Sequence, residues 1–360
     1  MIRFATIGTS AIVDRFLEAA ALCEGLVHTA VFSRKKETAK AFAKKHGAEF
    51  IYTDLKELAE SSDIDAVYIA SPNSCHCEQA VEMLKHGKHV LCEKPAASNA
   101  AELQRMRAAA ENGQAVLLEA MRSVYDPGFQ AIEANLYRLG KIRSVSFRFC
   151  QYSSRYDNFR KGIIENAFRP ELSNGALMDI GVYCVHPLVR LFGMPEKIEG
   201  ASVFLENGVD GMGTILAQYP GWQAVLQYSK ITSGYTESEV QGENGSMQID
   251  RIADTRKITI HERTGRRDVI LIPKEENNMV YEIREWLRLI ENSQEDEKSK
   301  IYEEASGNEC SFWIWQGKRW ESGFRQMFLR IAPCEKRVRQ KQRTLFASQI
   351  QTRNESVCIC

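Results

Sequence analysis

The sequence has no surplus of charge of either sign, because its 360 residues hold 47 Lys and Arg against 47 Asp and Glu. Proteins that bind nucleic acid or acidic membrane surfaces carry a positive field, so we expect neither as a partner. No apolar run approaches the roughly 20 residues that cross a bilayer, which predicts no membrane span. The ten cysteines are unevenly spaced and match no disulfide scaffold. Free thiols in a reducing cytoplasm are the simpler interpretation.

The N-terminal third alternates short apolar runs with helical patterns. The first run spans residues 2–8, which leaves no room for a signal peptide. Further apolar runs follow at 27–33, 66–70, 89–92 and 116–119. Short buried strands separated by amphipathic helices predict a parallel, doubly wound α/β sheet over residues 1–121. Such a sheet binds ligands at the carboxyl ends of its strands.

The pattern changes from residue 122 onward. We expect a helix over 129–137, a long strand over 142–152 and an apolar helix over 176–192. The strands that follow have no helices between them, which predicts an antiparallel sheet and an α+β domain over residues 122–304. These strands are expected at 197–204, 214–218, 224–229, 238–241, 247–249, 257–261 and 268–272, with a last helix over 280–290.

The final segment, residues 305–360, differs from the rest in composition. It carries ten basic and four acidic residues, and it holds four of the ten cysteines and three of the five tryptophans. Two interpretations stand: a basic interaction arm, or the product of a frameshift near residues 305–311. A shifted reading of residues 312–327 can encode Gly-Ile-Arg-Phe-Pro, and the coding DNA would decide between the two.

Two sequence features point to a dinucleotide cofactor. The turn after the first strand starts with Gly8, as the dinucleotide fingerprint requires, although Ser10 and Val13 replace its other two glycines. After the second strand, the usual acid that binds the ribose of NAD is absent, and Ser33 and Arg34 stand there. A hydroxyl and a guanidinium suit a 2′-phosphate, so we expect NADP(H) to be preferred over NAD(H). A plain strand–helix turn and a solvated basic loop are the alternatives.

Two groups of side chains could carry chemistry. Lys94 ends the fourth strand, where a nicotinamide ring would lie, and could donate a proton or hydrogen bond to a substrate oxygen. Asp179, Tyr183 and His186 share one face of the apolar helix at 176–192. A surface lysine and a structural hydrogen-bond cluster are the alternatives. Cysteines 75 and 77 are too close along a helix to share a metal, so no metal site is expected.

Four ordered motifs resemble the family named for glucose–fructose oxidoreductase, inositol dehydrogenase and MocA. They are Gly8-Thr9-Ser10, Ala70-Ser71-Pro72-Asn73 with His76, Glu93-Lys94-Pro95, and the run from Asn174 to Tyr183. The resemblance covers about residues 1–300 and is strongest to the dimeric dihydrodiol dehydrogenase branch. It implies a Rossmann domain, a second domain with a large open and mostly antiparallel sheet, and a homodimer or homotetramer formed through that sheet.

The resemblance also implies roles for single residues. Lys94, Asp179 and Tyr183 would be catalytic, with Tyr183 transferring a hydroxyl proton beside the Lys94 cation, or Lys94 transferring it instead. The cofactor would contact Gly8, Thr9, Ser10, Ile12, Ser33, Arg34, Ser71, Pro72, Asn73, His76 and Glu93. Arg155, Tyr156 and His186 are weaker substrate candidates.

The expected function is an NADP(H)-dependent oxidoreductase that acts on a CH–OH group of a small sugar, polyol or cyclic diol. The alternative is a cofactor-sensing regulator that keeps the fold without turnover. The presence of Lys94, Asp179 and Tyr183 together favours the enzyme, because a sensor has no need of all three.

Overall fold

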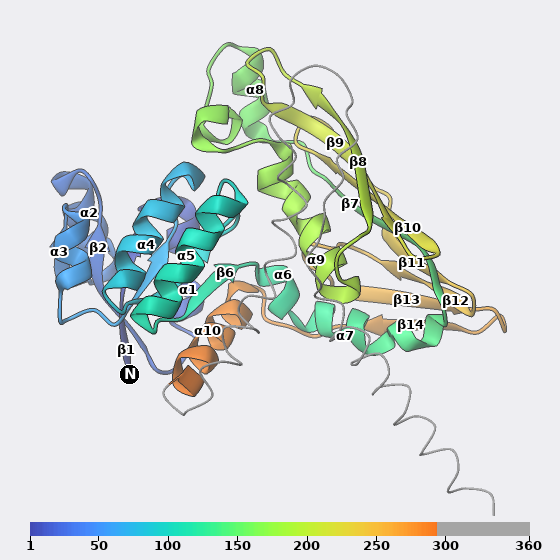
Figure 1. Cartoon of the computed structure of the whole chain (residues 1–360), viewed down its shortest axis with the longest axis horizontal. Helices are drawn as coiled ribbons and strands as arrows, with labels where there is room; N and C mark the ends of the chain where they lie inside the picture. The colour runs from blue at the N-terminus through green and yellow to red at the C-terminus, as the bar shows by residue number, and fades with distance from the viewer. Residues whose placement is uncertain (294–360) are drawn as a thin grey trace, which may run out of the picture. The chain divides into compact units, whose positions relative to one another are not determined.

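The computed structural model describes residues 1–293 (Figure 1). The tail predicted at 305–360, its frameshift hypothesis and the end of the second predicted domain lie outside the described residues. Within them the chain builds two sheets, one of six strands and one of eight. The predicted fold class, a Rossmann domain plus an α+β domain, is therefore confirmed.

The first sheet is parallel throughout, in the order β3-β2-β1-β4-β5-β6. Its central strands are buried on both faces, which is why they read as continuous apolar runs rather than alternating ones. The strand order reverses direction between β1 and β4, so the cleft between their carboxyl ends is the topological switch point. The strands are β1 (Ile2–Ile7), β2 (Leu26–Phe32), β3 (Phe50–Tyr52), β4 (Ala66–Ile69), β5 (His89–Glu93) and β6 (Leu117–Ala120).

Local capping fixes several helices of this domain. Asp54 accepts hydrogen bonds from the first turn of α3, a short helix that the sequence pattern missed. Asn99 caps α5 and accepts from the Glu102 amide, and the Glu102 carboxylate accepts from the Ser98 amide, an arrangement close to a capping box. The helices are α1 (Ala11–Ala20), α2 (Lys36–His46), α3 (Leu55–Glu60), η1 (Asn73–Cys75), α4 (His76–Lys85) and α5 (Ala100–Gly113).

The last described helix, α10 (Met279–Ser293), packs on the first domain although the second domain precedes it in sequence (Figure 1). Its buried Ile283, Trp286 and Ile290 share one hydrophobic cluster with Phe4 and Phe16. Because burial of such side chains contributes roughly 1.5–3 kcal/mol each, this packing anchors the helix there. The predicted domain limits at residues 121 and 304 stay a prediction, and we propose that α10 belongs to the first domain.

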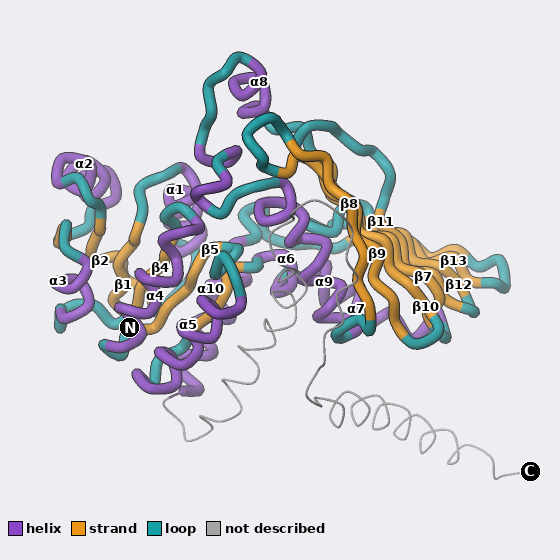
Figure 2. The backbone as a smooth tube through the Cα atoms, turned by 45° about the horizontal axis from the view of Figure 1, so that its top comes forward, coloured by secondary structure: helices purple, strands orange, loops and turns teal. Residues whose placement is uncertain are grey.

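The second sheet has the order β14-β13-β12-β11-β7-β10-β9-β8. Every pair is antiparallel except β10 with β7, which run parallel. The strands of this sheet lie side by side on the right of Figure 2. They are β7 (Ile142–Cys150), β8 (Lys197–Phe204), β9 (Asp210–Tyr219), β10 (Trp222–Ser229), β11 (Ser238–Gly242), β12 (Gly245–Ile249), β13 (Lys257–Glu262) and β14 (Arg267–Leu271).

The strands alternate between buried and partly exposed residues, so one face of the sheet carries the core. Cys184, Val185 and Leu188 pack into that core from the apolar helix. Shorter helical segments connect the domains and border the core: α6 (Arg122–Tyr125), α7 (Pro127–Asn135), η2 (Leu136–Leu139), α8 (Ser154–Arg160), η3 (Asn166–Phe168) and η4 (Pro170–Leu172).

The apolar helix predicted over 176–192 is not uniform. It starts with a π-helical turn, η5 (Leu177–Gly181), and continues as α9 (Val182–Phe192). The segment Pro170–Phe192 has the length and composition of a membrane span, which the search for apolar runs did not anticipate. Two thirds of it is buried inside the protein, as in the core helix of a globular domain.

A buried cluster of charged side chains holds together segments that lie between the two domains. The Lys274 ammonium lies 2.6 Å from Asp126 Oδ2 and 2.7 Å from Asp254 Oδ1. The Lys274 side chain is fully buried, and Asn278 also donates to both carboxylates. The segment before α10 is thus held against the start of α7 and the turn before β13.

Candidate active site

The carboxyl edge of the parallel sheet gathers most of the predicted residues. The turn at Gly8 follows β1, Ser33 follows β2, Ser71 follows β4, and Lys94 follows β5. The Gly8 amide donates to the Phe32 carbonyl, which places the first turn directly beside the end of β2. The parallel topology therefore brings these segments together, as the sequence pattern predicts.

The first turn fits a dinucleotide. Gly8 has a φ of +124°, and a Cβ at this position would lie 2.6 Å from the Ala70 carbonyl oxygen. Only glycine allows this close approach. Helix α1 begins at Ala11, and the side chain of its N-cap, Ser10, binds none of its amides. The start of a helix without such a cap is a suitable site for a phosphate. Val13 is buried and joins the core, so its side chain fills space that the fingerprint usually leaves to glycine.

Thr9, Ser10 and Ile12 lie on the same turn and first helical residues, and each is at least partly accessible. Ser33 is half-buried and Arg34 is exposed, directly after β2. The Ser33 hydroxyl accepts from the Lys35 amide at 3.4 Å. A hydroxyl and a guanidinium at the end of β2 are suitable donors for a phosphate on the adenosine ribose.

Residues of the Ser71–His76 loop make contacts within the first domain and with the second domain. Pro72 precedes η1, and the Ser71 hydroxyl donates to Gln79. Asn73 reaches the second domain, where its amide donates to the Ser173 carbonyl and Asn174 Oδ1. His76 is fully buried, and its ring nitrogens lie 2.9 Å from the carbonyl oxygens of Ser71 and Pro95. We propose that His76 holds the two loops together rather than contacting a cofactor.

Lys94 and Asp179 meet although they come from different domains. Lys94 Nζ donates to the Asp179 backbone carbonyl at 2.7 Å and to Asp179 Oδ1 at 3.0 Å. The Lys94 side chain is 14% exposed and that of Asp179 is 31% exposed. Asp179 lies in the π-helical turn, a type of irregular turn that often marks functional positions.

Tyr183 completes this cluster one turn after Asp179. The Lys94 ammonium lies 5.2 Å from the centre of the Tyr183 ring, and the Arg122 guanidinium lies 5.7 Å from it. Two cations thus border the ring of one buried tyrosine. Lys94, Asp179 and Tyr183 are brought together as the resemblance implies, and Arg122 joins them.

The opposite charges of Lys94 and Asp179 each stabilise the ionised form of the other side chain. Burial alone would lower the pKa of Lys94, but the charges of Asp179, Tyr183 and Glu93 outweigh it and raise that pKa. Burial alone would raise the pKa of Asp179, but Lys94 and Lys230 outweigh it and hold that pKa well below its usual range. Lys94 is therefore an ammonium and Asp179 a carboxylate at neutral pH.

Two further acids at the carboxyl edge of the parallel sheet accept hydrogen bonds from backbone amides at or just after Lys94. Glu93 accepts a hydrogen bond from the Tyr68 hydroxyl at 2.6 Å and one from the Lys94 amide at 3.2 Å. Glu119 is 5% exposed and accepts from the Ala96 amide, in the loop that follows Lys94. Burial raises the pKa of Glu119 to about 7.

The weaker substrate candidates take different positions. Arg155 is exposed and forms an ion pair with Glu165 at 3.4 Å. Tyr156 stacks in an aromatic group with Tyr152, Phe159 and Phe168. His186 is 2% exposed, and its Nε2 lies 3.9 Å from Glu119 Oε2, so it belongs to the buried interior rather than to an open pocket.

Sequence reasoning missed two residues of this site. Arg122 follows β6 directly, so the rule that ligands bind at strand ends could have singled it out. Lys230 follows β10 and lies 2.7 Å from Asp179 Oδ2. No local signal marks Lys230, because its partner is 51 residues away in sequence.

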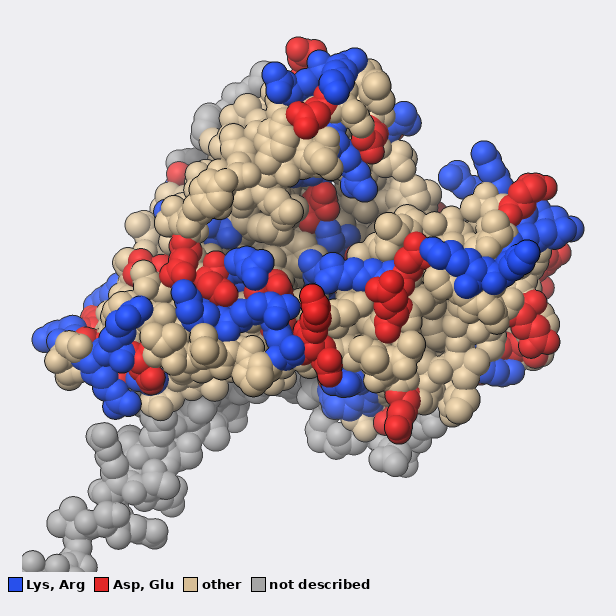
Figure 3. Space-filling view, turned by 180° about the vertical axis from the view of Figure 1, so that it is seen from behind, with Lys and Arg blue, Asp and Glu red and all other residues tan. Residues whose placement is uncertain are grey.

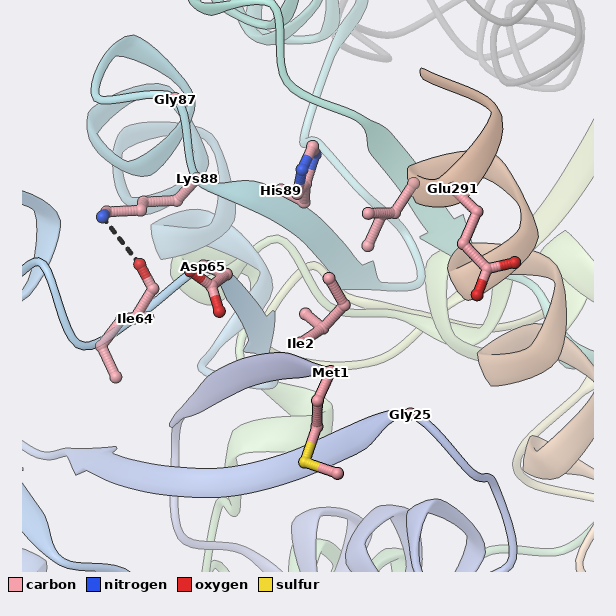
Figure 4. Close-up of a pocket in the computed structure, with 10 residues that line it drawn as sticks. Met1, Ile2, Gly25, Ile64, Asp65, Gly87, Lys88, His89 and Glu291 are labelled. Atoms are coloured by element: carbon pink, nitrogen blue, oxygen red, sulfur yellow. Dashed lines mark hydrogen bonds between the residues drawn. The ribbon is translucent and has the colours of Figure 1, made fainter. Parts of the chain in front are cut away.

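A cavity of about 470 Å³ lies elsewhere, at the amino ends of the strands of the parallel sheet (Figure 4). It is lined by residues that precede β1, β2, β4 and β5 and by the end of α10. Its lysine, Lys88, donates to the carbonyls of Ser61 and Ile64. We place the functional site at the opposite edge because the charged cluster lies there.

Figure 3 shows acidic and basic side chains interspersed on one face of the protein.

Comparison with known proteins gives matches over both domains. Residues 2–120 match the oxidoreductase family with an NAD-binding Rossmann fold, and residues 134–248 match the GFO/IDH/MocA C-terminal domain. The chain is 48% identical over 303 residues to the scyllo-inositol 2-dehydrogenase (NADP(+)) IolU of Bacillus subtilis, which covers 84% of this chain and 92% of that protein.

Two further proteins are similar. The trans-1,2-dihydrobenzene-1,2-diol dehydrogenase of Xenopus tropicalis is 33% identical over 223 residues, or 61% of this chain and 66% of that protein. A 3-ketoreductase of Actinomadura kijaniata, solved with NADP and TDP-benzene, shares the fold. Its TM-score is 0.74 at 23% identity, over 87% of this chain and 95% of that one.

Proposed function

The chain belongs to the Gfo/Idh/MocA family of oxidoreductases, and from that premise we propose that it is an NADP(H)-dependent dehydrogenase of a cyclic polyol. The observation that carries this proposal is the cluster of Lys94, Asp179 and Tyr183 at the carboxyl edge, next to the Gly8 turn. The resemblance favoured the dihydrodiol dehydrogenase branch. The higher identity to an inositol dehydrogenase, 48% against 33%, moves the expected substrate to inositol-like polyols.

The site fits the cofactor. The Gly8 turn and the uncapped start of α1 would hold the pyrophosphate. Ser33 and Arg34 would hold the 2′-phosphate of NADP(H), in agreement with the cofactor of the inositol dehydrogenase relative. A bound nicotinamide supplies the acceptor or donor of hydride, and the protein supplies orientation and proton transfer.

In the oxidation direction, Tyr183 would act as the phenolate, whose oxygen takes the proton of the substrate hydroxyl as the hydride leaves the carbon that bears this hydroxyl. Lys94 donates a hydrogen bond to the same substrate oxygen, because two of its N–H groups are used on Asp179 and one remains. The Lys94 and Arg122 cations attract the negative charge that develops during the transfer. Asp179 orients Lys94 and binds substrate hydroxyls.

The structure favours Tyr183 over Lys94 as the group that moves the proton. The raised pKa of Lys94 keeps it protonated at neutral pH, so it donates a hydrogen bond but is a poor proton acceptor. The raised pKa follows from the acids around it, which outweigh burial. Proton transfer by Lys94 itself is therefore the less favourable route.

We also propose how the protein assembles and where in the cell it lies. The face of the eight-stranded sheet that carries partly exposed residues is the expected surface for a homodimer or homotetramer. The six described cysteines are free thiols, which agrees with a cytoplasmic enzyme.

The test is turnover with a defined cofactor and substrate. The purified chain is mixed with NADP⁺ or NAD⁺ and scyllo-inositol, myo-inositol or a trans-dihydrodiol, and absorbance at 340 nm is followed. We expect reduction of NADP⁺ with an inositol and a lower kcat/KM with NAD⁺. Tight binding of NADPH without turnover on any polyol would refute the enzyme and support the sensing regulator.

A further inference from the structure

The Asp179 carboxylate lies between two ammonium groups. Oδ1 faces Lys94 Nζ at 3.0 Å, and Oδ2 faces Lys230 Nζ at 2.7 Å. Both ion pairs are largely shielded from water, because the lysine side chains are 14% and 3% exposed. The two oxygens of one acid are thus each fixed by a different lysine.

Lys230 is used by protein groups rather than open to a substrate. Its ammonium donates to the Ala167 carbonyl at 2.8 Å as well as to Asp179. It also lies 4.7 Å from the centre of the Phe168 ring. The Lys230 side chain is only 3% exposed. We therefore expect Lys230 to influence the reaction through the groups it holds.

The contacts of Lys230 join three segments that are distant in sequence. Lys230 follows β10, Ala167 and Phe168 lie in η3, and Asp179 lies in η5. A buried ammonium is costly in free energy unless it is paired and hydrogen-bonded. A π-helical turn such as η5 lacks regular α-helical hydrogen bonding, so an external contact is needed to fix its side chains.

We infer that Lys230 is a positioning residue, which fixes the Asp179 carboxylate and through it the Lys94 ammonium. This inference rests on the proposed function, since it assigns a role within the same site. The charges of Lys94 and Asp179 cancel each other. Lys230 adds one positive charge beside this pair, which suits the negative charge that develops on the substrate oxygen during hydride transfer.

The experiment compares Lys230→Met, Lys230→Arg and a control, Lys274→Met, in the full chain. Lys274 is also a buried lysine that holds two carboxylates, but it bonds to Asp126 and Asp254 and not to Asp179. Measured quantities are kcat and KM for the inositol, the Kd for NADPH and the melting temperature.

For Lys230→Met we expect kcat to fall about 100-fold, as for a misplaced catalytic group. We expect little change in the Kd for NADPH. Lys230→Arg, which keeps the charge, should restore most of kcat. Lys274→Met should lower the melting temperature but leave kcat nearly unchanged. If Lys230→Met does not fold, Lys230→Gln carries the same comparison.

Two negative outcomes are distinguishable. An active wild-type enzyme in which Lys230→Met keeps its kcat overturns the role of Lys230 alone. An equal fall of kcat in Lys274→Met also overturns it, because the effect would then be a general loss of stability. A wild-type chain that binds NADPH but turns over no polyol overturns the proposed function itself.

Discussion

Replacing Glu119 by Gln should stabilise the protein at alkaline pH and leave it nearly unchanged in acid. Glu119 is 5% exposed, and its Oε1 accepts from the Ala96 amide at 2.9 Å. Burial raises its pKa from 4.5 to about 7. Gln keeps the carbonyl acceptor and nearly the same shape but never ionises, so the variant isolates the free energy of the buried charge.

The sign follows from proton linkage. With a pKa of about 7 in the folded state and 4.5 in the unfolded state, the folded protein binds more protons between these values. The stability of the wild-type protein therefore falls as pH rises through that window, and the buried carboxylate destabilises the fold fully above pH 7. At 1.36 kcal/mol per pH unit the gap corresponds to about 3 kcal/mol. Below pH 4.5 the acid is protonated in both states, and the cost vanishes.

Urea denaturation at pH 5 and pH 8 measures this effect. The free energy of unfolding of Glu119→Gln, relative to wild type, should rise by roughly 2–3 kcal/mol between the two pH values. The difference between pH values cancels any effect of the amide that does not depend on pH. Glu111→Gln, on the exposed side of α5, is the control and should stay within about 0.5 kcal/mol of wild type. An equal difference at both pH values would refute the reasoning.

Four other substitutions address the cofactor and the chemistry. Gly8→Ala places a Cβ 2.6 Å from the Ala70 carbonyl oxygen at a φ of +124°, so we expect a loss of roughly 1–3 kcal/mol in stability and weaker NADPH binding, by denaturation and fluorescence titration. Arg34→Ala should weaken NADPH roughly 10-fold or more and leave NADH nearly unchanged, which two parallel titrations would show. Lys94→Met and Tyr183→Phe should each lower kcat by about 10²–10⁴-fold with an unchanged Kd for NADPH, by steady-state kinetics. Near-normal turnover in both would remove these residues from the mechanism.

The sequence was sufficient for features that depend on neighbouring residues. Strands of the parallel sheet read as short apolar runs, and the capping box at Asn99 and Glu102 is a pattern of four residues. Because parallel strands align their carboxyl ends, the turns that hold Gly8, Ser33, Ser71 and Lys94 could be placed at one edge before any coordinates were known. The strand over residues 197–204 was predicted at the limits that the structure shows.

Features that depend on distant pairing were not predictable. The parallel pairing of β10 with β7 is not encoded in either strand, since both fit an antiparallel sheet equally well. That pairing carries the end of β10, and with it Lys230, to the π-helical turn. The return of α10 to the first domain is equally invisible, because an amphipathic helix shows that one face is buried but not against which core.

The same distinction explains why the site was only partly found. Lys94 and Asp179 could be singled out one by one, from a strand end and from polar residues in an apolar helix. Their ion pair requires the two domains to approach, and Asn73 shows one device for this, since it donates across to Ser173 and Asn174. A group whose role comes from its partners, such as Lys230, has no signal of its own in the sequence. The proposed catalytic residues are therefore easier to predict from the sequence than the residues proposed to position them.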